Sequence, residues 1–426
     1  MSQSIFEEMI ATRRALHQRP EEGWTEFETT YLVVNRLKAL GFKKVLVGHE
    51  IIDPDWVLGR NPDLIKREIA RAIANGVPAS FIEEIDELTG CVAVLETGRK
   101  GPVSAFRFDM DALLIEETAD ENHLPNKEGF RSQRKGIMHA CGHDGHTALG
   151  LAVARWVIEN QDHLTGTIKI VFQPAEEGVR GAVAIAHSGI LDDVNVILAS
   201  HCGGVIEPGE IGLVHSGVLA STKFDISFTG TPSHAGNQPH KGHSALMAAC
   251  ATSMMLVGIP RHGDGASRVA VGRLTAGEGR NITPVHAYIQ AEVRGETAEV
   301  NDYMGRAVET IVKGNALAYE VEAEVKRVGD ATTIVDCPEI LDIVREVAKT
   351  VDGVKNVVDL RRPAGSEDYT MMLKRVVDHG GQGGLFRWGC RHHGHHKADF
   401  DIQDTQCMPI AFGVFTGFID RINGCH

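Results

Sequence analysis

The sequence predicts an α/β protein with a mainly parallel sheet, interrupted by a smaller ferredoxin-like α+β domain. First, its 426 residues exceed the size at which a single hydrophobic core usually stops growing. Second, short β-rich runs alternate with helical runs over much of the chain, as in parallel sheets covered by helices. Third, the segment 218–331 follows the order β-α-β-β-α-β. We therefore expect one domain at 1–217 and 332–426, with a helical insertion at 49–90, and a second domain at 218–331.

Composition and charge narrow the class of protein. Hydrophobic residues make up 43% of the chain and charged residues 23%, which is typical of a globular protein. The 57 acidic side chains outnumber the 43 basic ones and give a net charge of −14. Such an acidic chain is not expected to bind nucleic acid or an anionic membrane surface.

The N-terminus and the cysteines favour a cytoplasmic protein. Residues 1–8 contain neither the basic nor the apolar segment of a signal peptide. The longest apolar stretch, 245–259, is too short to span a bilayer. The eight cysteines show no disulfide framework and no Cys-x-x-Cys pair, so we expect reduced thiols.

The first 90 residues predict helices. Over the first 40 residues apolar side chains recur at helical spacing, and Gly41 is placed to end the helix. In the insertion, Asn61 before a proline predicts a helix start, and Ser80 with Glu83 predicts a capping box. We interpret the insertion as a two-helix hairpin at the surface, without chemistry of its own.

Strands and helices alternate in both predicted domains. In the larger domain we expect strands at 103–108, 167–172 and 195–200, and helices at 147–159 and 179–187. In the smaller domain we expect strands at 223–229, 268–274, 287–294 and 321–327, and helices at 244–259 and 302–314. In the larger domain, chemically active side chains follow the strand ends, which is where open α/β sheets place their sites.

The run from His139 to Thr147 carries three imidazoles, one thiol and one carboxylate within nine residues. Two glycines leave its backbone free to fold tightly. Such a density of nitrogen, sulfur and oxygen donors favours a transition-metal site. The alternative is a polar turn that happens to contain histidines.

A pair of adjacent carboxylates, Glu176 and Glu177, follows the second predicted strand. At a strand-to-helix turn, one carboxylate can ligate a metal while its neighbour takes a proton from water. The alternative is a helix N-terminus whose acids suit the helix macrodipole.

Three further groups are ambiguous when each is taken alone. His201 follows a buried strand and could be an ordinary core histidine. The run 391–396 contains four histidines and could be a surface metal binder. Asp109 and Asp111 lie at the end of the first predicted strand, where they either orient metal-bound histidines or are simple loop acids.

Taken together, these segments resemble the M20 metallopeptidase family, in its branch of amidohydrolases that act on N-acyl amino acids. The likeness runs from about residue 10 to about residue 418. The segments that carry it are Arg14-Ala-Leu-His17-Gln-Arg-Pro20-Glu21, Arg107-Phe-Asp-Met-Asp-Ala-Leu113, His139-Ala-Cys-Gly-His-Asp-Gly-His146, Pro174-Ala-Glu-Glu-Gly178, Gly365-Ser-Glu-Asp368 and His396-x-x-x-Phe400-Asp-Ile.

The resemblance implies a dinuclear metal centre in the larger domain. Its ligands would be Cys141, His143, Glu177, His201 and His396. His395 is the alternative to His396, because the histidine run leaves the register uncertain by one residue. Two divalent ions are expected. Mixed Cys, His and carboxylate ligands suit Mn or Zn, and the resemblance favours Mn.

The resemblance also implies catalytic roles in the larger domain. Glu176 would be the proton shuttle, and Asp111 would support a metal ligand. The role of Asp109 stays open, because most relatives outside this branch have a histidine at that position.

The smaller domain would act as a lid and mediate dimerisation. His234 would reach from a partner subunit to the scissile carbonyl oxygen. Asn281 and Arg294 would bind the free carboxylate of the substrate. The alternatives are a turn histidine for His234 and a surface charge for Arg294.

The implied reaction is hydrolysis of the amide bond of an N-acyl amino acid. The 49–90 insertion, the segment Thr222–Asp225 and the ending Gly394–Phe400 resemble hydrolases of p-aminobenzoyl-glutamate, which release p-aminobenzoate and glutamate. The alternatives are hydrolysis of other N-acyl or indole conjugates of amino acids, and a non-catalytic subunit of a hydrolase heterodimer. We expect a homodimer or a heterodimer with a homologous subunit, whereas a scaffold would leave the ordered ligand set unexplained.

Overall fold

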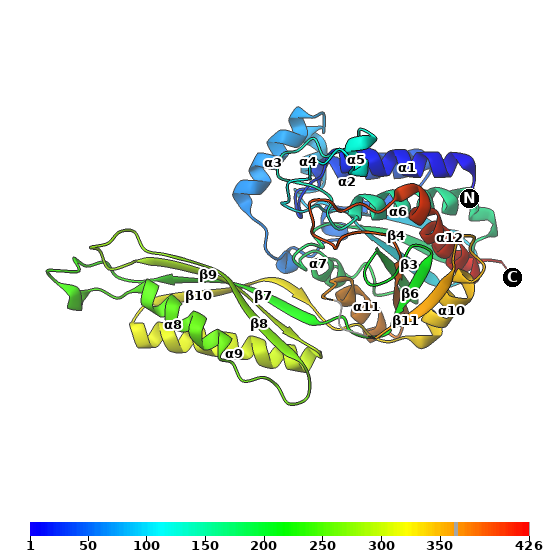
Figure 1. Ribbon diagram of the computed structural model, residues 1–426. Coiled ribbons are helices and arrows are strands. Elements are labelled where there is room, and N and C mark those ends of the chain that lie inside the picture. The colour runs from blue at the N-terminus through cyan, green and yellow to red at the C-terminus, as the bar shows by residue number, and fades with distance from the viewer. Residues whose placement is uncertain (362–364, 426) are drawn as a thin grey trace. The chain divides into compact units, whose positions relative to one another are not determined.

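The computed structural model describes residues 1–361 and 365–425. This part of the chain divides into two compact units (Figure 1). The second unit comprises Val218–Thr333 and Gly365–Glu367, and the first comprises the other described residues.

The first unit is built on an eight-stranded sheet with the strand order β1-β2-β4-β3-β5-β12-β6-β11. The neighbours β3–β4, β3–β5, β5–β12 and β6–β11 are parallel, and the other pairs are antiparallel. The expected α/β class with a mainly parallel sheet is therefore confirmed. The strands are Lys44–Val47 (β1), Cys91–Glu96 (β2), Val103–Asp109 (β3), Thr167–Gln173 (β4), Val196–Cys202 (β5), Glu210–Val214 (β6), Asn356–Leu360 (β11) and Gln382–Trp388 (β12).

Two groups of helices pack on this sheet (Figure 1). In one group α6 contacts β3, β4 and β5, and α1, α2 and α12 pack against α6. In the other, α7 and α11 pack together, and α11 contacts β5 and β12. The helices of this unit are Gln3–His17 (α1), Phe27–Leu40 (α2), Pro62–Ala74 (α3), Ala79–Glu84 (α4), Leu124–Lys127 (α5), His143–Glu159 (α6), Ala182–His187 (α7), Pro338–Ala348 (α10), Tyr369–Asp378 (α11) and Asp404–Asn423 (α12).

The first 40 residues form two helices separated by an irregular segment. The expectation of helix throughout is therefore wrong over residues 18–26. Pro20 lies in this segment, and proline cannot donate a helical hydrogen bond and clashes with the preceding turn. Gly41 ends α2 in the left-handed conformation, with φ 108°, as expected of a C-terminal glycine.

The insertion contains the two expected helices, α3 and α4. The Asn61 side chain accepts hydrogen bonds from two backbone N–H groups in the first turn of α3, as expected of an N-cap. The expected capping box is wrong. Helix α4 begins directly after Pro78, whose fixed φ already suits a helix start, and Ser80 lies inside the helix.

Three element boundaries differ from expectation around the candidate site. His201 lies inside β5, which runs on to the next residue. Helix α6 begins at His143 rather than Thr147, because Gly142 adopts φ 91° and turns the chain into the helix. Helix α7 begins later than expected, because Val179 adopts φ 57° and cannot belong to a right-handed helix.

The second unit has the β-α-β-β-α-β order of a ferredoxin-like domain, as expected. Its sheet has the strand order β10-β7-β9-β8, and all neighbours are antiparallel. Apolar side chains alternate along β7, and those on its inner face join the core beneath the two helices. The elements are Ala220–Thr229 (β7), Ala245–Val257 (α8), Ser267–Ala276 (β8), His286–Gly295 (β9), Ala298–Tyr319 (α9) and Glu322–Ala331 (β10).

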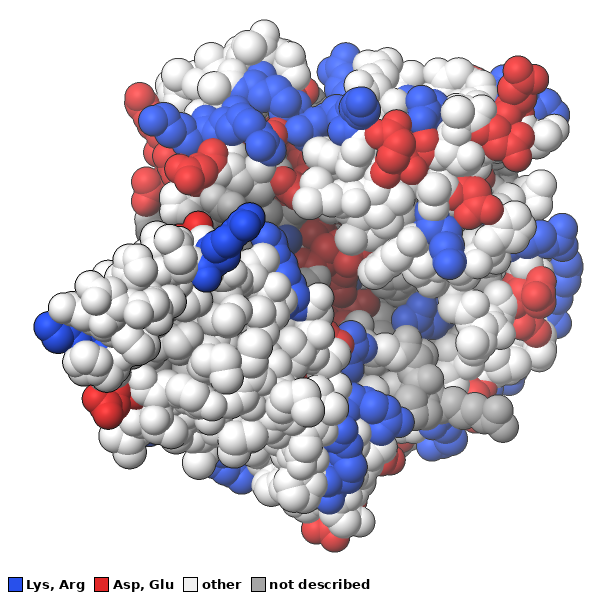
Figure 2. Space-filling model, turned by 60° about the vertical axis from the view of Figure 1, so that its left-hand side comes forward, with Lys and Arg blue, Asp and Glu red and all other residues white. Residues whose placement is uncertain are grey.

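Charged side chains of both signs are spread among uncharged ones over the face drawn in Figure 2. Within the described residues, none of the helices combines the length and apolar character needed to cross a bilayer.

Candidate metal centre

Three neighbouring strands bring the candidate ligands to one edge of the sheet. Strands β3, β4 and β5 run parallel to one another, so their carboxyl ends meet at the same edge. Asp111 follows β3, the turn with Glu176 and Glu177 follows β4, and His201 lies near the end of β5. Residues far apart in the sequence therefore converge because of the strand order.

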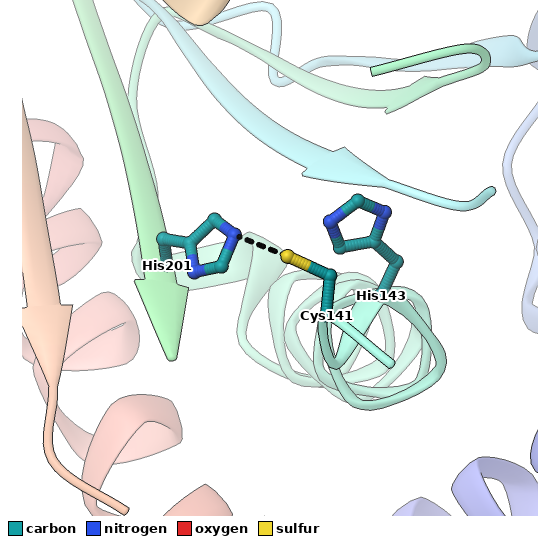
Figure 3. Close-up of side chains that lie close together, drawn as sticks. All are labelled: Cys141, His143 and His201. Atoms are coloured by element: carbon teal, nitrogen blue, oxygen red, sulfur yellow. Dashed lines mark hydrogen bonds between the residues drawn. The ribbon is translucent and has the colours of Figure 1, made fainter. Parts of the chain in front are cut away.

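Cys141, His143 and His201 form the buried centre of this group (Figure 3). The Cys141 Sγ atom lies 3.4 Å from the His201 Nε2 atom. One potential ligand atom from each of the three residues lies within 4.8 Å of the others. The tight turn at Gly142 puts Cys141 just before α6 and His143 on its first turn.

Each of the two imidazoles is oriented by a hydrogen bond to one of its nitrogens. Nδ1 of His143 lies 3.2 Å from a carboxylate oxygen of Asp111, and Nδ1 of His201 lies 2.8 Å from the backbone oxygen of Cys202. These acceptors require that Nδ1 carries the proton, so Nε2 of the neutral ring has a lone pair that can accept a hydrogen bond or bind a metal. The Nε2 atom of His143 is buried and makes no hydrogen bond.

Glu177 and His396 lie beside this centre. Oε1 of Glu177 is 3.2 Å from Nε2 of His396, and these two residues group with Cys141 within 4.8 Å. His395 behaves differently, because its Nε2 lies 3.1 Å from the backbone oxygen of Cys202 and donates to it. The tertiary structure therefore brings His396, rather than His395, next to the carboxylate.

Glu176 also lies close to His143. Its Oε2 atom is 3.8 Å from Nε2 of His143, and Glu176 groups with His143 and Glu177. The two oxygens of Asp111 accept hydrogen bonds from the backbone N–H groups of Glu176 and Glu177, at 3.1 and 2.9 Å. Asp111 thus holds both the His143 ring and the turn that carries the two glutamates.

Asp109 contacts a histidine for which the sequence predicted no role. Its carboxylate lies 2.5 Å from Nδ1 of His146, and it also pairs with Arg107. Nε2 of His146 accepts a hydrogen bond from the backbone N–H of Cys202 at 3.0 Å. Both nitrogens of His146 therefore make hydrogen bonds. Asp109 orients this histidine of α6, which in turn contacts the backbone of β5.

Burial and charge set the protonation of the central residues. Burial, followed by the Glu177 carboxylate, raises the pKa of the Cys141 thiol well above its ordinary value. Burial, followed by His146 and Arg387, lowers the pKa of His201 well below its ordinary value, so this ring is neutral. For His143, burial alone would lower the pKa, but Asp109 and the hydrogen bond to Asp111 outweigh it and raise the pKa.

These residues fit a divalent metal ion. A proton and a cation compete for the same His143 lone pair, so the negative surroundings that raise its proton affinity also favour a cation. A cation likewise stabilises a buried thiolate, which burial otherwise disfavours. The Nε2 atom of His143 is buried without a hydrogen bond, and the Asp111–His143 pair matches the carboxylate–histidine arrangement that surrounds metal sites in proteins.

A buried network behind the centre was not predicted from the sequence. Asp144 pairs with Arg13 at 2.9 Å and with Nδ1 of His17 at 2.7 Å. Nε2 of His17 lies 3.0 Å from Glu117. All four side chains are buried. His17 belongs to a segment that carries the family likeness, but its neighbours in space cannot be read from its position in the chain.

The three candidate residues of the second unit lie in that unit as follows. His234 is exposed, and its Nδ1 atom accepts the backbone N–H groups of Gly236 and Asn237 at 3.2 and 3.1 Å. Its Nε2 atom therefore carries the proton. Asn281 is also exposed. Arg294, on β9, makes two hydrogen bonds to the Glu292 carboxylate, at 3.0 and 3.2 Å.

Comparison with known proteins finds relatives along almost the whole chain. The model of peptidase family M20/M25/M40 matches residues 105–421. A relative from Haemophilus influenzae, a homolog of one of the subunits of p-aminobenzoyl-glutamate hydrolase, is 41% identical over 97% of this chain and 98% of its own length. The indole-3-acetyl-aspartic acid hydrolase of Enterobacter agglomerans is also 41% identical, over 96% of this chain and 94% of its own.

A solved structure extends this likeness to three dimensions. The crystal structure of the aminobenzoyl-glutamate utilization protein from Klebsiella pneumoniae superposes with a TM-score of 0.84 at 35% identity, over 97% of this chain and 95% of that one. The chain therefore belongs to the M20/M25/M40 peptidase family, a family of metal-dependent hydrolases.

Proposed function

We propose that this protein hydrolyses the amide bond between an aromatic acyl group and an acidic amino acid, and that p-aminobenzoyl-glutamate is its substrate. The products are p-aminobenzoate and glutamate. Two relatives are named for substrates of this kind, one for p-aminobenzoyl-glutamate and the other for indole-3-acetyl-aspartate. Both substrates join an aromatic acyl group to an amino acid with two carboxylates.

The single observation that carries the proposal is the convergence of distant donors around Cys141 and His143. In our proposal two divalent ions, Mn or Zn, bind there. Their ligands are Cys141, His143, Glu177, His201 and His396. When bound, such ions polarise the amide carbonyl and lower the pKa of a water molecule towards neutrality.

Glu176 is the general base and acid in this proposal. It takes a proton from the attacking water and afterwards delivers it to the nitrogen of the leaving amine, so the proton count is unchanged after one turnover. Its position beside Glu177, on a turn whose backbone is held by Asp111, supports this role.

The second unit supplies the remaining groups. His234, from a partner subunit, donates its Nε2–H to the developing oxyanion, and its tautomer supports that role because Nδ1 already accepts two backbone N–H groups. Arg294 and Asn281 bind the free carboxylate of the substrate. Arg294 already donates two hydrogen bonds to the Glu292 carboxylate. On substrate binding its guanidinium would donate to the substrate carboxylate in place of Glu292.

A dimer, either with a second copy or with a homologous subunit, accounts for an apolar surface on the second unit. Helix α8 exposes Met247, Met254, Met255 and Val257, and it packs on β8, which is an edge strand. Exposed apolar patches and open sheet edges commonly mark protein interfaces. Light scattering of the purified protein, with and without a Met254→Glu substitution, measures whether this surface forms the dimer.

A second candidate is hydrolysis of indole conjugates of amino acids, which the 41% identity to an indole-3-acetyl-aspartic acid hydrolase favours. A non-catalytic subunit is a weaker candidate, because Glu176 and the complete donor set are present.

The test is a substrate panel assayed with protein purified without chelator and analysed for bound metal. The panel contains p-aminobenzoyl-glutamate, indole-3-acetyl-aspartate and N-benzoyl-glycine, each with and without a homologous partner subunit. We expect the largest kcat/KM for p-aminobenzoyl-glutamate. Preference for the indole conjugate selects the second candidate. No cleavage by metal-loaded protein, alone or with the partner, contradicts the proposed function.

A further inference from the structure

The turn that carries Glu176 and Glu177 has a strained backbone. Ala175 and Val179 have φ of 51° and 57°, and Gly178 has φ of 86°. The left-handed region disfavours residues with a side chain, and a β-branched valine above all. Such conformations persist only where the surrounding structure holds them in place. Contacts from other parts of the chain must therefore hold this turn.

Two buried carboxyl groups accept hydrogen bonds from consecutive backbone amides of the turn. Asp111 accepts the N–H groups of Glu176 and Glu177. Glu26, which is fully buried, accepts the N–H group of Ala175 at 2.7 Å with one of its oxygens. The other oxygen of Glu26 is hydrogen-bonded to the Thr89 hydroxyl, also at 2.7 Å. Thr89 lies at the C-terminal end of the 49–90 insertion, so Glu26 links the insertion to the turn.

Arg180 makes a second link between the turn and the insertion. Its Nε atom donates to the backbone oxygen of Glu177 at 2.8 Å, and its Nη1 atom donates to the backbone oxygen of Gly59, in the insertion, at 3.2 Å. The guanidinium also lies against Gly23, where a Cβ atom would come within 2.3 Å of Nη2. The position of Arg180 therefore requires a glycine at residue 23.

The two links meet the insertion at different points. Glu26 contacts Thr89, near its end, and Arg180 contacts Gly59, in its first third. Trp24 adds a neighbouring contact, because its indole N–H donates to the backbone oxygen of Leu58 at 2.8 Å. The segment that joins α1 to α2 and the insertion thus contact each other next to the strained turn.

We propose that Glu26 and Arg180 are positioning residues through which the 49–90 insertion holds the strained turn, and with it Glu176 and Glu177, in place. The inference rests on the proposed function for the roles of those two glutamates. Arginine suits the Arg180 position because its planar fork donates to two carbonyl groups at once, whereas lysine has a single nitrogen. This assigns a role to an insertion that the sequence alone suggested was a plain surface hairpin.

The test compares two links with one matched control. Thr89→Val removes only the hydroxyl that is hydrogen-bonded to Glu26. Arg180→Gln removes the guanidinium that donates to the backbone oxygen of Gly59. Arg60→Gln is the control, because Arg60 donates to the backbone and side chain of Glu87 within the insertion and has no contact with the turn among its hydrogen bonds to described residues. Each variant is measured for kcat and KM, for the rate at which a chelator removes its metal, and for Tm.

We expect Thr89→Val and Arg180→Gln to lower kcat about tenfold, with KM within about twofold of wild type, because a misplaced catalytic group costs transition-state rather than ground-state binding. Both should also lose metal several-fold faster than wild type, since Glu177 lies on the same turn. Arg180→Lys, which keeps one donor, should recover part of the loss. Arg60→Gln should match wild type in kcat and metal loss.

Two outcomes overturn the inference. One is wild-type kcat and metal retention in Thr89→Val and Arg180→Gln. The other is an equal loss in the Arg60→Gln control, which would indicate a general effect of the insertion on stability. Arg180→Lys and Thr89→Val are mild enough to keep the test valid if Arg180→Gln does not fold. If wild type retains metal but cleaves no substrate, the proposed function fails, and the chelator experiment still decides the inference.

Discussion

Several candidate residues of the first unit are held more firmly than those of the second, although His396 is itself exposed. His143 and His201 are buried, and a hydrogen bond to Nδ1 orients each ring. His234 and Asn281, by contrast, are exposed on loops of the second unit. Arg294 is part-buried and tied to a neighbouring glutamate on its own strand.

The difference is consistent with the different roles that we propose for the two groups. Metal ligands must be placed accurately before the reaction begins, which requires buried side chains with fixed partners. Groups that bind substrate can be positioned when the substrate arrives. Changes to the proposed metal ligands of the first unit should therefore alter both metal content and turnover, whereas changes in the second group should alter turnover and leave the metal in place.

The largest expected effect separates chemistry from metal binding within the first unit. Glu176→Ala should lower kcat by roughly a thousandfold, because a general base contributes on the order of 10²–10⁴ in rate. Metal content should stay at the wild-type level, since Glu176 is not a ligand in our proposal. Elemental analysis and steady-state kinetics on the same sample measure both. Near-normal turnover would refute the role of Glu176.

Cys141→Ser tests the first group through its thiolate. Loss of a soft ligand should weaken metal binding at least about tenfold, and activity should fall in proportion to the lost metal. Cys250→Ser is the matched control, because Cys250 is an exposed cysteine of the second unit. Full metal occupancy in Cys141→Ser would remove the thiol from the ligand set.

His234→Ala tests the second group. We expect kcat to fall roughly a hundredfold, the effect of losing one donor to an oxyanion, while metal content stays unchanged. His240→Ala serves as the control, since His240 is an exposed histidine in the same part of the second unit. Metal loss from His234→Ala would contradict the distinction between the two groups.

The last prediction concerns the stability of the first unit rather than its activity. Burial, followed by the charge of Asp111, raises the pKa of Glu26 to about 8, whereas a glutamate in an unfolded chain titrates near about 4.3. Between these values the folded protein keeps a proton that the unfolded chain has released. The free energy of unfolding should therefore fall as the pH rises through this window.

Glu26→Gln cannot ionise and removes that part of the pH dependence. Thermal unfolding of wild type and Glu26→Gln between about pH 5 and 8 should show the steeper fall of Tm in wild type. Glu28→Gln controls for general effects of removing a carboxylate nearby. Parallel Tm curves for wild type and Glu26→Gln would show that Glu26 does not titrate in this range.

The prediction of secondary structure worked where periodicity was regular. The alternating apolar residues of β7 and the order of elements in the second unit were visible in the sequence, because strand and helix periods differ. It failed where single residues set a boundary. Pro20 interrupts the N-terminal helical region, and Pro78 moves the start of α4, neither of which affects the apolar period.

By itself the sequence determined the fold class and a set of candidate residues, because hydrophobic periodicity and dense runs of metal-binding side chains are local properties of a chain. Only the tertiary structure decided which of these residues meet. It brings His396 rather than His395 beside Glu177 and pairs Asp109 with His146. It also places Glu26 where it accepts a hydrogen bond from the backbone N–H of Ala175. These contacts join residues on different strands and loops. They depend on strand order and loop geometry, which cannot be inferred from a local sequence pattern.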